Sequence, residues 1–301
     1  MFPKTVIIIT GPTASGKTDL AIQVASHFNT SIISADSRQC FRELNIGVAK
    51  PTRTQLELVK HEFINSHSIH DEVNAAVFES LAMKWCDDIF SYRDVVVMCG
   101  GTGLYIKAFR EGLDEIPAVS EGIRKVIIDL YAENGLAGLQ ESIKEHDPLY
   151  FSSGEISNPQ RLMRALEVVK TTGRSILSFR NKEKKQRPFR ILEFAINISR
   201  KELYQRINKR VEQMMEDGLL DEVKSLLPYQ GLNALNTVGY TELFDYLQGK
   251  LSLDESLSLM KQNTRRYAKR QITWLNKNED LFWLDANYLQ KILSIYEGVK
   301  I

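Results

Sequence analysis

The chain has 301 residues, of which 43% are hydrophobic and 26% are charged, and its net charge is +1. This composition excludes an intrinsically disordered chain, and the length suits one α/β core with a smaller domain or insertion. The three cysteines, Cys40, Cys86 and Cys99, have no C-x-x-C spacing, so we expect reduced thiols rather than a zinc site or a disulfide framework. The apolar N-terminal run is too short for a signal sequence or a membrane span, and no later segment is long enough. We therefore expect a cytoplasmic protein without membrane contact.

The N-terminal segment predicts a phosphate-binding loop. Residues 11–18, GPTASGKT, match the pattern G-x-x-x-x-G-K-[ST] at every fixed position. The apolar run 5–9 predicts a strand before the loop, and the apolar spacing over 19–28 predicts a helix after it. The alternative, a chance glycine-rich turn, would not need this strand and helix on its two sides. In such a loop the backbone N–H groups point at phosphate oxygens, Lys17 adds a positive charge, and Thr18 offers its hydroxyl to Mg²⁺.

Strands and helices alternate through the rest of the first third. The pattern predicts strands over 31–35 and 95–98, with a helix over 73–90 between them. This order is typical of a parallel sheet with helices on both faces, in which ligands bind beyond the carboxyl ends of the strands. Asp36 follows the second strand and the GGTG run 100–103 follows the third. We therefore expect both beside the phosphate loop in one crevice.

The later chain predicts a helical insertion and then a return to the core. Helical segments after residue 114 are broken at 134–135, 147–148 and 158–159, and they end in a charged stretch over 181–188. We interpret residues 114–189 as a helical insertion, and residues 1–113 with 190–301 as one phosphate-loop core. In the returning core the pattern predicts strands over 192–198 and 281–284, and helices over 201–227 and 253–276.

Asp36 is the first candidate for chemistry beyond phosphate binding. A carboxylate at a strand end could ligate Mg²⁺ or accept a proton from a nucleophile, and the alternative is a helix N-cap. The third strand ends in Met98-Cys99-Gly100, without the acidic residue that holds Mg²⁺ in many nucleotide hydrolases. The sequence therefore does not favour ordinary ATP hydrolysis.

Two basic zones stand out from the neutral average. Residues 161–190 contain ten Lys or Arg and two acids, and residues 261–277 contain six Lys or Arg and no acid. Such zones are typical of a nucleic-acid partner, although each could also be a solvated helix face. In the helix predicted from residue 201, Arg206 and Arg210 lie one turn apart. They could clamp a diphosphate, or they could lie on a solvated stripe.

Seven strings connect these features to a known family. The combination closely resembles the tRNA dimethylallyltransferases, also called tRNA isopentenyltransferases, over residues 5–274. The chain lacks the zinc-binding C-terminal extension of many eukaryotic members, so it resembles the bacterial type. The strings are GPTASGKT, ISADSRQCF, NIGVAKP, GGTGLYIKA, NPQRLMRALEV, VGYTELFDYL and TRRYAKRQITWL, in this order.

The resemblance implies a prenyl transfer. In the family, the dimethylallyl group of dimethylallyl diphosphate passes to N6 of adenosine 37, next to the tRNA anticodon, and diphosphate leaves. It implies Mg²⁺ as cofactor with Thr18 as its protein ligand, and the anticodon arm of tRNA as partner. Because no obligate protein partner is evident in the sequence, we also expect a monomer. The resemblance implies Asp36 as the general base, Thr102 near the adenosine, and Lys17, Thr18 and Arg206 as stabilisers of the leaving group. The implied diphosphate-binding residues are Gly11, Thr13, Ala14, Ser15, Gly16, Lys17, Thr18 and Arg210.

The resemblance also implies a set of tRNA-binding residues. For one member of this set, Tyr240, packing in the core is an open alternative to tRNA contact. For Ile272 and Trp274, which are outside the set, we expect core packing. The set is Asp36, Ser37, Arg38, Gln39, Thr102, Arg124, Gln160, Arg161, Leu162, Met163, Arg164, Gly239, Tyr240, Arg266, Lys269 and Arg270.

The chain departs from the family pattern in two places, and other functions remain open. Residues 155–159, EISNP, replace a common His-Pro-Asn-Asp run, and Phe41 replaces a tyrosine. One alternative function is a phosphate-loop small-molecule kinase, which does not need two basic zones. A second is an adenylate isopentenyltransferase acting on free AMP or ATP, and a third is an RNA-binding protein with a decayed nucleotide site.

Overall fold

The chain folds into two compact units. The computed structural model describes residues 4–180 and 184–298. The sheet unit comprises Met1–Glu111 with Gln186–Ile301, and the helical unit comprises Gly112–Lys185. Residues 181–183 of the predicted charged stretch lie outside the described residues. None of the described helices combines the length and hydrophobicity needed to cross a lipid bilayer.

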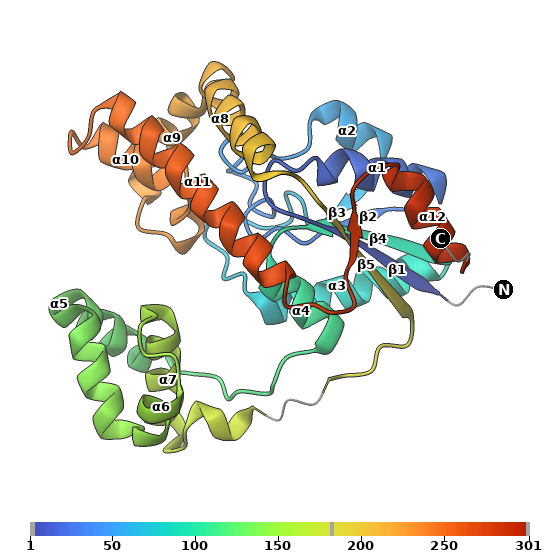
Figure 1. Cartoon of the computed structure of the whole chain (residues 1–301). Coiled ribbons are helices and arrows are strands. Elements are labelled where there is room, and N and C mark those ends of the chain that lie inside the picture. Colours follow the sequence, from blue (N-terminus) through green and yellow to red (C-terminus); the bar gives the residue numbers. More distant parts are fainter. Residues whose placement is uncertain (1–3, 181–183, 299–301) are drawn as a thin grey trace. The chain divides into compact units, whose positions relative to one another are not determined.

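The sheet unit is built on six parallel strands in the order β3-β2-β4-β1-β5-β6 (Figure 1). The central strand β1 pairs with β4 on one side and with β5 on the other. This confirms the predicted α/β class with a parallel sheet. The short strand β3 was not predicted, because two residues cannot show a periodic pattern. The strands are β1 (Thr5–Thr10), β2 (Ile32–Ser34), β3 (His61–Glu62), β4 (Val95–Gly100), β5 (Arg190–Ile196) and β6 (Phe282–Leu284).

Helices cover both faces of this sheet, as Figure 1 shows, with α1 and α12 on one side and α3 and α4 on the other. The central strands are continuous apolar runs because both of their faces are covered. Every residue of β1 and β4 is buried. These helices are α1 (Lys17–His27), α3 (Ala75–Phe90), α4 (Gly103–Glu111) and α12 (Tyr288–Glu297).

A second group of helices, α8 to α11, lies together in Figure 1. The single helix predicted over 201–227 is wrong, because Gly218 has a left-handed φ of 98° that separates α8 from α9. Glycine adopts this conformation without the steric cost of a side chain. The remaining helices of the sheet unit are α2 (Arg53–Leu58), α8 (Arg200–Glu216), α9 (Leu219–Leu226), α10 (Tyr240–Leu247) and α11 (Leu253–Leu275), with short 3₁₀ helices η2 (Leu227–Tyr229) and η3 (Asn233–Leu235).

The helical unit has a hydrophobic core of its own, in which Ile127, Leu139 and Leu166 are fully buried. Two of its helices begin where the sequence predicted breaks, because Asp147 and Asn158 cap them and a proline follows each cap. The predicted break at 134–135 is confirmed, because Gly135 has non-helical φ 61° and ψ −155° and divides α5 into two helical segments. The elements are α5 (Glu121–His146), α6 (Pro148–Ser153), α7 (Pro159–Thr172) and the 3₁₀ helix η1 (Ile176–Phe179).

Candidate active site

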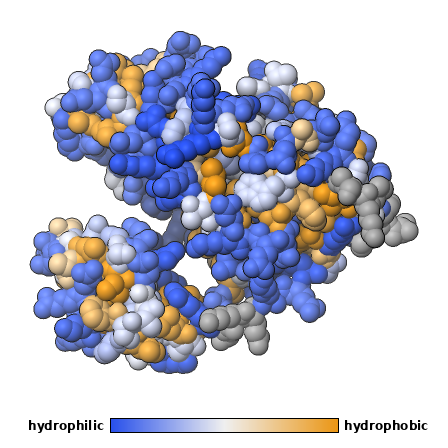
Figure 2. All heavy atoms as spheres, in the orientation of Figure 1, coloured by the Kyte–Doolittle hydropathy of each residue, from blue (hydrophilic) through white to orange (hydrophobic). Residues whose placement is uncertain are grey.

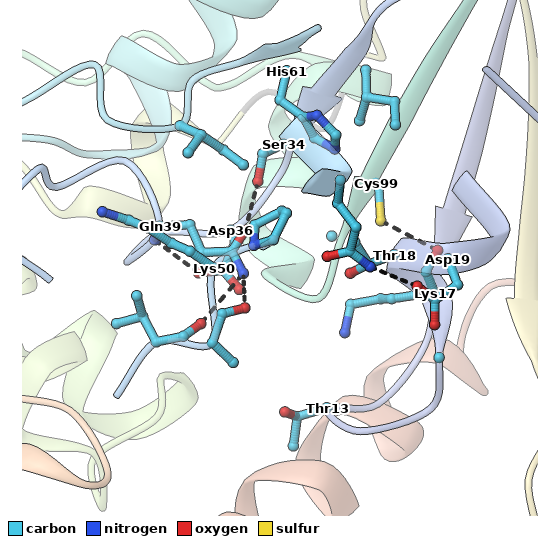
Figure 3. A pocket seen from close by; sticks show the side chains of 18 of the residues that line it. Thr13, Lys17, Thr18, Asp19, Ser34, Asp36, Gln39, Lys50, His61 and Cys99 are labelled. Carbon is cyan, nitrogen blue, oxygen red and sulfur yellow. Dashed lines mark hydrogen bonds between the residues drawn. The ribbon is translucent and has the colours of Figure 1, made fainter. Parts of the chain in front are cut away.

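A cavity of about 350 Å³ opens beyond the carboxyl ends of β1, β2 and β4. Its wall contains phosphate-loop residues, the strand-end residue Asp36, the segment 48–51 and two arginines of α8. Figure 3 shows the Lys17 side chain pointing into this cavity from one side, with Asp36 and Lys50 on the other. The predicted convergence of the strand ends on one crevice is therefore confirmed. We call this space the donor cavity.

The phosphate loop has the backbone that an anion site requires. Gly11, Ala14 and Gly16 all have positive φ, at 153°, 64° and 91°. Gly16 also precedes α1 without a side-chain cap, so the first N–H groups of this helix are not satisfied by a capping side chain. These N–H groups and the helix dipole favour an anion at this point.

Lys17 and Thr18 stand at the start of α1, where both line the donor cavity. Burial lowers the pKa of Lys17 below its usual value, and Arg210 adds to this, whereas Cys99 and Asp36 act in the opposite direction. A phosphate anion beside the ammonium would favour its charged form. Among the described residues, Lys17 Nζ donates one long hydrogen bond, of 3.4 Å, to the carbonyl of Pro12. The site therefore provides a cation that gains from an anionic ligand.

The Asp36 side chain accepts backbone hydrogen bonds and also lines the donor cavity. Its Oδ1 accepts hydrogen bonds from the N–H groups of Arg38 at 2.9 Å and of Gln39 at 3.3 Å. No helix begins there, so the alternative of a helix N-cap is wrong, and the carboxylate stabilises a turn instead. Both bonds go to Oδ1, and no described residue is hydrogen-bonded to Oδ2, which leaves that oxygen for a ligand. This geometry suits a general base held in a fixed orientation.

A second cavity, of about 330 Å³, adjoins the first. The two share Thr13, Asp36, Val48, Ala49 and Arg210 as lining residues. The second cavity extends from these residues to α8, α11 and the segment 236–238. We call it the acceptor cavity. Two ligands could thus meet at Asp36 from two directions.

The two arginines of α8 differ in their surroundings. Burial lowers the pKa of Arg210, while Asp36 opposes this, and Arg210 Nη1 donates to Thr13 Oγ1 at 3.3 Å. Arg206 is about half exposed, pairs with Glu202 at 2.6 Å, and donates to the Ser15 carbonyl at 3.2 Å. Both line the donor cavity, but only Arg210 also lines the acceptor cavity.

The predicted residues of the turn after β2 make contacts within the protein. Ser37 N–H donates to Thr102 Oγ1 at 3.0 Å, and Thr102 lines neither cavity. Arg38 donates to the carbonyls of Asn233 at 3.0 Å and Asn236 at 3.3 Å. The Gln39 side chain donates to two carbonyls of the segment that walls the cavities, at 3.0 and 3.3 Å. These contacts hold the turn and the neighbouring segments in place, and contact of the same residues with tRNA stays a prediction.

The predicted tRNA-binding residues divide by exposure. Leu162 is 0% exposed and Met163 9% exposed in the core of the helical unit, and Tyr240 is 0% exposed. These three side chains pack in the core of their units, and their contact with RNA stays a prediction. Exposed side chains in the set include Arg124, Gln160 and Arg161 of the helical unit and Arg266, Lys269 and Arg270 of α11. On the face seen in Figure 2, hydrophilic residues predominate over α8 and much of α11.

Three further residues contribute to the site although no motif argument singled them out. Gln271 contacts the phosphate loop, Lys50 lines the donor cavity, and Glu222 accepts hydrogen bonds from the backbone of Ile46 and Gly47. Gln271 and Lys50 lie in the strings KRQITWL and NIGVAKP, so these strings were the available signal. Glu222 lies on α9 in no string, and nothing in the sequence pointed to it.

The described residues contain three free, buried cysteines and no group of three or more His, Cys, Asp or Glu side chains that could hold a metal ion. Burial raises the pKa of Cys99, which lines the donor cavity, to about 12. It therefore stays a neutral thiol. The three thiols are free among the described residues, as the sequence led us to expect.

Comparison with known proteins gives one consistent family. Residues 39–278 match the family model described as IPP transferase. The chain is 44% identical to tRNA dimethylallyltransferase 1 of Bacteroides thetaiotaomicron over 290 residues, which cover 96% of this chain and 94% of that protein.

Solved structures agree with this match. The crystal structure of the full-length tRNA isopentenylpyrophosphate transferase from Bacillus halodurans superposes with a TM-score of 0.70 at 32% identity, covering 98% of this chain and 95% of that one. A eukaryotic dimethylallyltransferase acting on tRNA gives a TM-score of 0.82 at 25% identity, covering 98% of this chain and 79% of that one.

Proposed function

Because the chain belongs to the tRNA dimethylallyltransferase (IPP transferase) family, we propose that it transfers a dimethylallyl group from dimethylallyl diphosphate to N6 of adenosine 37 in tRNA, releasing diphosphate. The observation that carries this proposal is the pair of cavities that meet at Asp36. One cavity has an anion-binding loop and suits the diphosphate donor. The other opens toward α11 and suits an unstacked purine.

The donor cavity contains what the leaving group needs. The diphosphate would lie on the phosphate loop, with Lys17, Arg206 and Arg210 around it. As the allylic carbon–oxygen bond breaks, negative charge grows on the departing oxygen, and fixed cations stabilise that charge. The apolar prenyl tail has partners in Ile32, Val48 and Ile64, which line the same space.

Mg²⁺ is compatible with this arrangement. It usually takes few protein ligands, keeps several waters and binds phosphate oxygens, so a single hydroxyl from Thr18 beside a diphosphate is a sufficient protein contribution. The absence of a carboxylate and histidine cluster among the described residues agrees with that mode. When bound, Mg²⁺ would neutralise part of the diphosphate charge.

Asp36 would act on the acceptor. The N6 lone pair forms a bond to the allylic carbon, the carbon–oxygen bond breaks with its electrons on diphosphate, and the N6 proton passes to the Asp36 carboxylate. The residue lies on both cavities, so it can reach an amine that enters from the acceptor side. The carboxylate need not activate water.

The target adenine must unstack from its neighbours in the tRNA, at a cost of about a few kcal/mol, before its N6 amine can enter the acceptor cavity. Basic side chains that contact the RNA backbone offset this cost. Exposed Arg266, Lys269 and Arg270 of α11 suit that purpose, as do Arg124 and Arg161 of the helical unit. The anticodon arm as partner, a monomeric protein and a cytoplasmic location remain predictions.

One assay tests the proposal. Purified protein, Mg²⁺ and labelled dimethylallyl diphosphate are incubated with unmodified tRNA, with the same tRNA carrying G at position 37, or with AMP. Label in the first acceptor alone is the expected result. Label in AMP would instead support an adenylate isopentenyltransferase, and consumption of ATP without prenyl transfer would support a kinase.

A further inference from the structure

Gln271 of α11 joins two loops of the site without lining either cavity. Its Oε1 accepts a hydrogen bond from the Thr13 N–H at 2.8 Å, and its Nε2 donates to the Gly101 carbonyl at 2.9 Å. The side chain is 8% exposed. One buried amide thus connects the phosphate loop, the turn after β4 and α11.

The packing around this amide is tight. A Cβ added to Gly101 would lie 2.3 Å from Gln271 Nε2, and one added to Gly103 would lie 2.5 Å from the Trp274 ring. Tyr267, one turn before Gln271, makes a side-chain hydrogen bond to Thr102. Side chains spaced by four and three residues share one helix face. This face of α11 therefore packs against residues 101–103 of the glycine turn.

The contact leads directly to the residues between the cavities. Because Gln271 holds the Thr13 N–H, this amide is occupied by the protein rather than by a ligand. The hydroxyl of the same Thr13 accepts from Arg210 at 3.3 Å, and both residues line both cavities. Without the Gln271 amide, the Thr13 N–H and the Gly101 carbonyl would lose these partners, which costs free energy at a partly buried position.

We propose that Gln271 is a positioning residue that holds the first turn of the phosphate loop, and with it Thr13 and Arg210, in the geometry that binds diphosphate. The inference rests on the proposed function in that the anion is taken to be the diphosphate of the prenyl donor. Gln271 itself touches no substrate. Its effect reaches the ligand through the Thr13 backbone and the guanidinium of Arg210.

The test compares Gln271→Met with Gln262→Met, since Gln262 is an exposed glutamine on the same helix. Binding of inorganic diphosphate with Mg²⁺ is measured by calorimetry, and kinetics and thermal unfolding are measured on the same samples. We expect Gln271→Met to raise the Kd for diphosphate and the KM for the donor about tenfold, with kcat and tRNA affinity within about threefold of wild type. Gln262→Met should match wild type.

A steric variant keeps the inference testable if Gln271→Met fails to fold. Gly101→Ala places a methyl group against the flexible end of Gln271 and should weaken diphosphate binding by a similar factor. In a Gln271→Ala background, which frees that space, Gly101→Ala should add little. A folded Gln271→Met with wild-type diphosphate affinity overturns the inference, as does a Gly101→Ala effect that persists in full without Gln271. Neither result depends on prenyl transfer, so the proposed function is judged separately.

Discussion

The carboxylate of Asp36 combines a structural and a chemical task on one side chain. Asp36→Asn separates them, because an amide oxygen still accepts the hydrogen bonds of the turn but cannot take a proton at neutral pH. We expect the single-turnover rate of prenyl transfer to fall by about 10²–10⁴, with tRNA affinity within about threefold of wild type. A variant that keeps near wild-type turnover would contradict the role of general base.

Arg210 is a site residue that we expect to lower the free energy of unfolding of the protein. Its guanidinium is partly buried and pairs with no described carboxylate within 4.0 Å, and its hydrogen bond goes to a neutral hydroxyl. Replacing a buried charge by an apolar side chain of similar size often stabilises a protein. We expect Arg210→Met to raise the free energy of unfolding by about 1–3 kcal/mol while abolishing prenyl transfer.

Urea unfolding and the transfer assay measure both effects. Arg206→Met is the matched control, because the half-exposed Arg206 already has a carboxylate partner and its removal should change stability by less than about 0.5 kcal/mol. If Arg210→Met is clearly less stable than wild type, the guanidinium stabilises the fold and the interpretation is wrong.

At the scale of elements, the segment 45–51 is held from two sides. Glu222 of α9 accepts from the N–H groups of Ile46 at 2.7 Å and Gly47 at 3.0 Å, and from the Tyr240 hydroxyl at 2.6 Å. The Tyr240 ring also lies where a Cβ on Gly47 would be, at 2.6 Å. Helices α9 and α10 therefore position a wall of both cavities, which explains why the string VGYTELFDYL contains a buried tyrosine.

Tyr240→Phe tests this role against direct RNA contact. The change keeps the ring and removes one hydrogen bond to a carboxylate, so we expect the free energy of unfolding to fall by about 1–3 kcal/mol. Urea titration measures the loss, with Tyr229→Phe, an exposed tyrosine, as control. Any loss of tRNA affinity should be no larger than the loss of folded protein explains. A large loss of tRNA affinity in a stable Tyr240→Phe protein would favour the RNA-contact role.

Lys50 in the same segment gives a pH dependence with a defined sign. Burial lowers its pKa from 10.5 to about 8, and Glu222 only partly offsets this. Between these two values the unfolded chain keeps a proton that the folded protein has released, so stability from this group rises with pH. The free energy of unfolding of wild type, relative to Lys50→Met, should therefore increase from pH 8 to pH 10.5 and stay constant below pH 7. Urea unfolding across this range measures it, and a flat or falling difference contradicts the prediction.

At the scale of the whole molecule, basic charge is concentrated in two zones, of which 261–277 lies in the sheet unit and most of 161–190 in the helical unit. If both contact tRNA phosphates, each exposed cation adds to the salt dependence of binding. We expect Arg161→Gln and Lys269→Gln each to reduce the slope of log K against log salt by about 0.7–0.9. Titrations at several salt concentrations measure this, with Lys84→Gln on α3 as control. If the slope is unchanged for one variant, the basic zone that contains the substituted residue does not contact tRNA phosphates.

Much of the fold and part of the site follow from local patterns. The strands β1 and β4 are nearly continuous apolar runs, and the phosphate loop lies between a strand and a helix at its expected place. The breaks predicted at 147–148 and 158–159 coincide with the starts of α6 and α7. In contrast, β3 is too short to show a pattern, and Gly218 ends α8 within an apolar spacing that continues into α9.

The sequence by itself determined the parallel α/β class, the phosphate loop and the candidate base Asp36, because each depends on residues close together in the chain. Only the tertiary structure decided which predicted contacts are buried, as for Leu162 and Tyr240, and which arginine of α8 lies between the cavities. The Gln271 contact to Thr13 spans 258 positions of the chain. Such a contact depends on how every intervening element packs, so no local pattern can contain it.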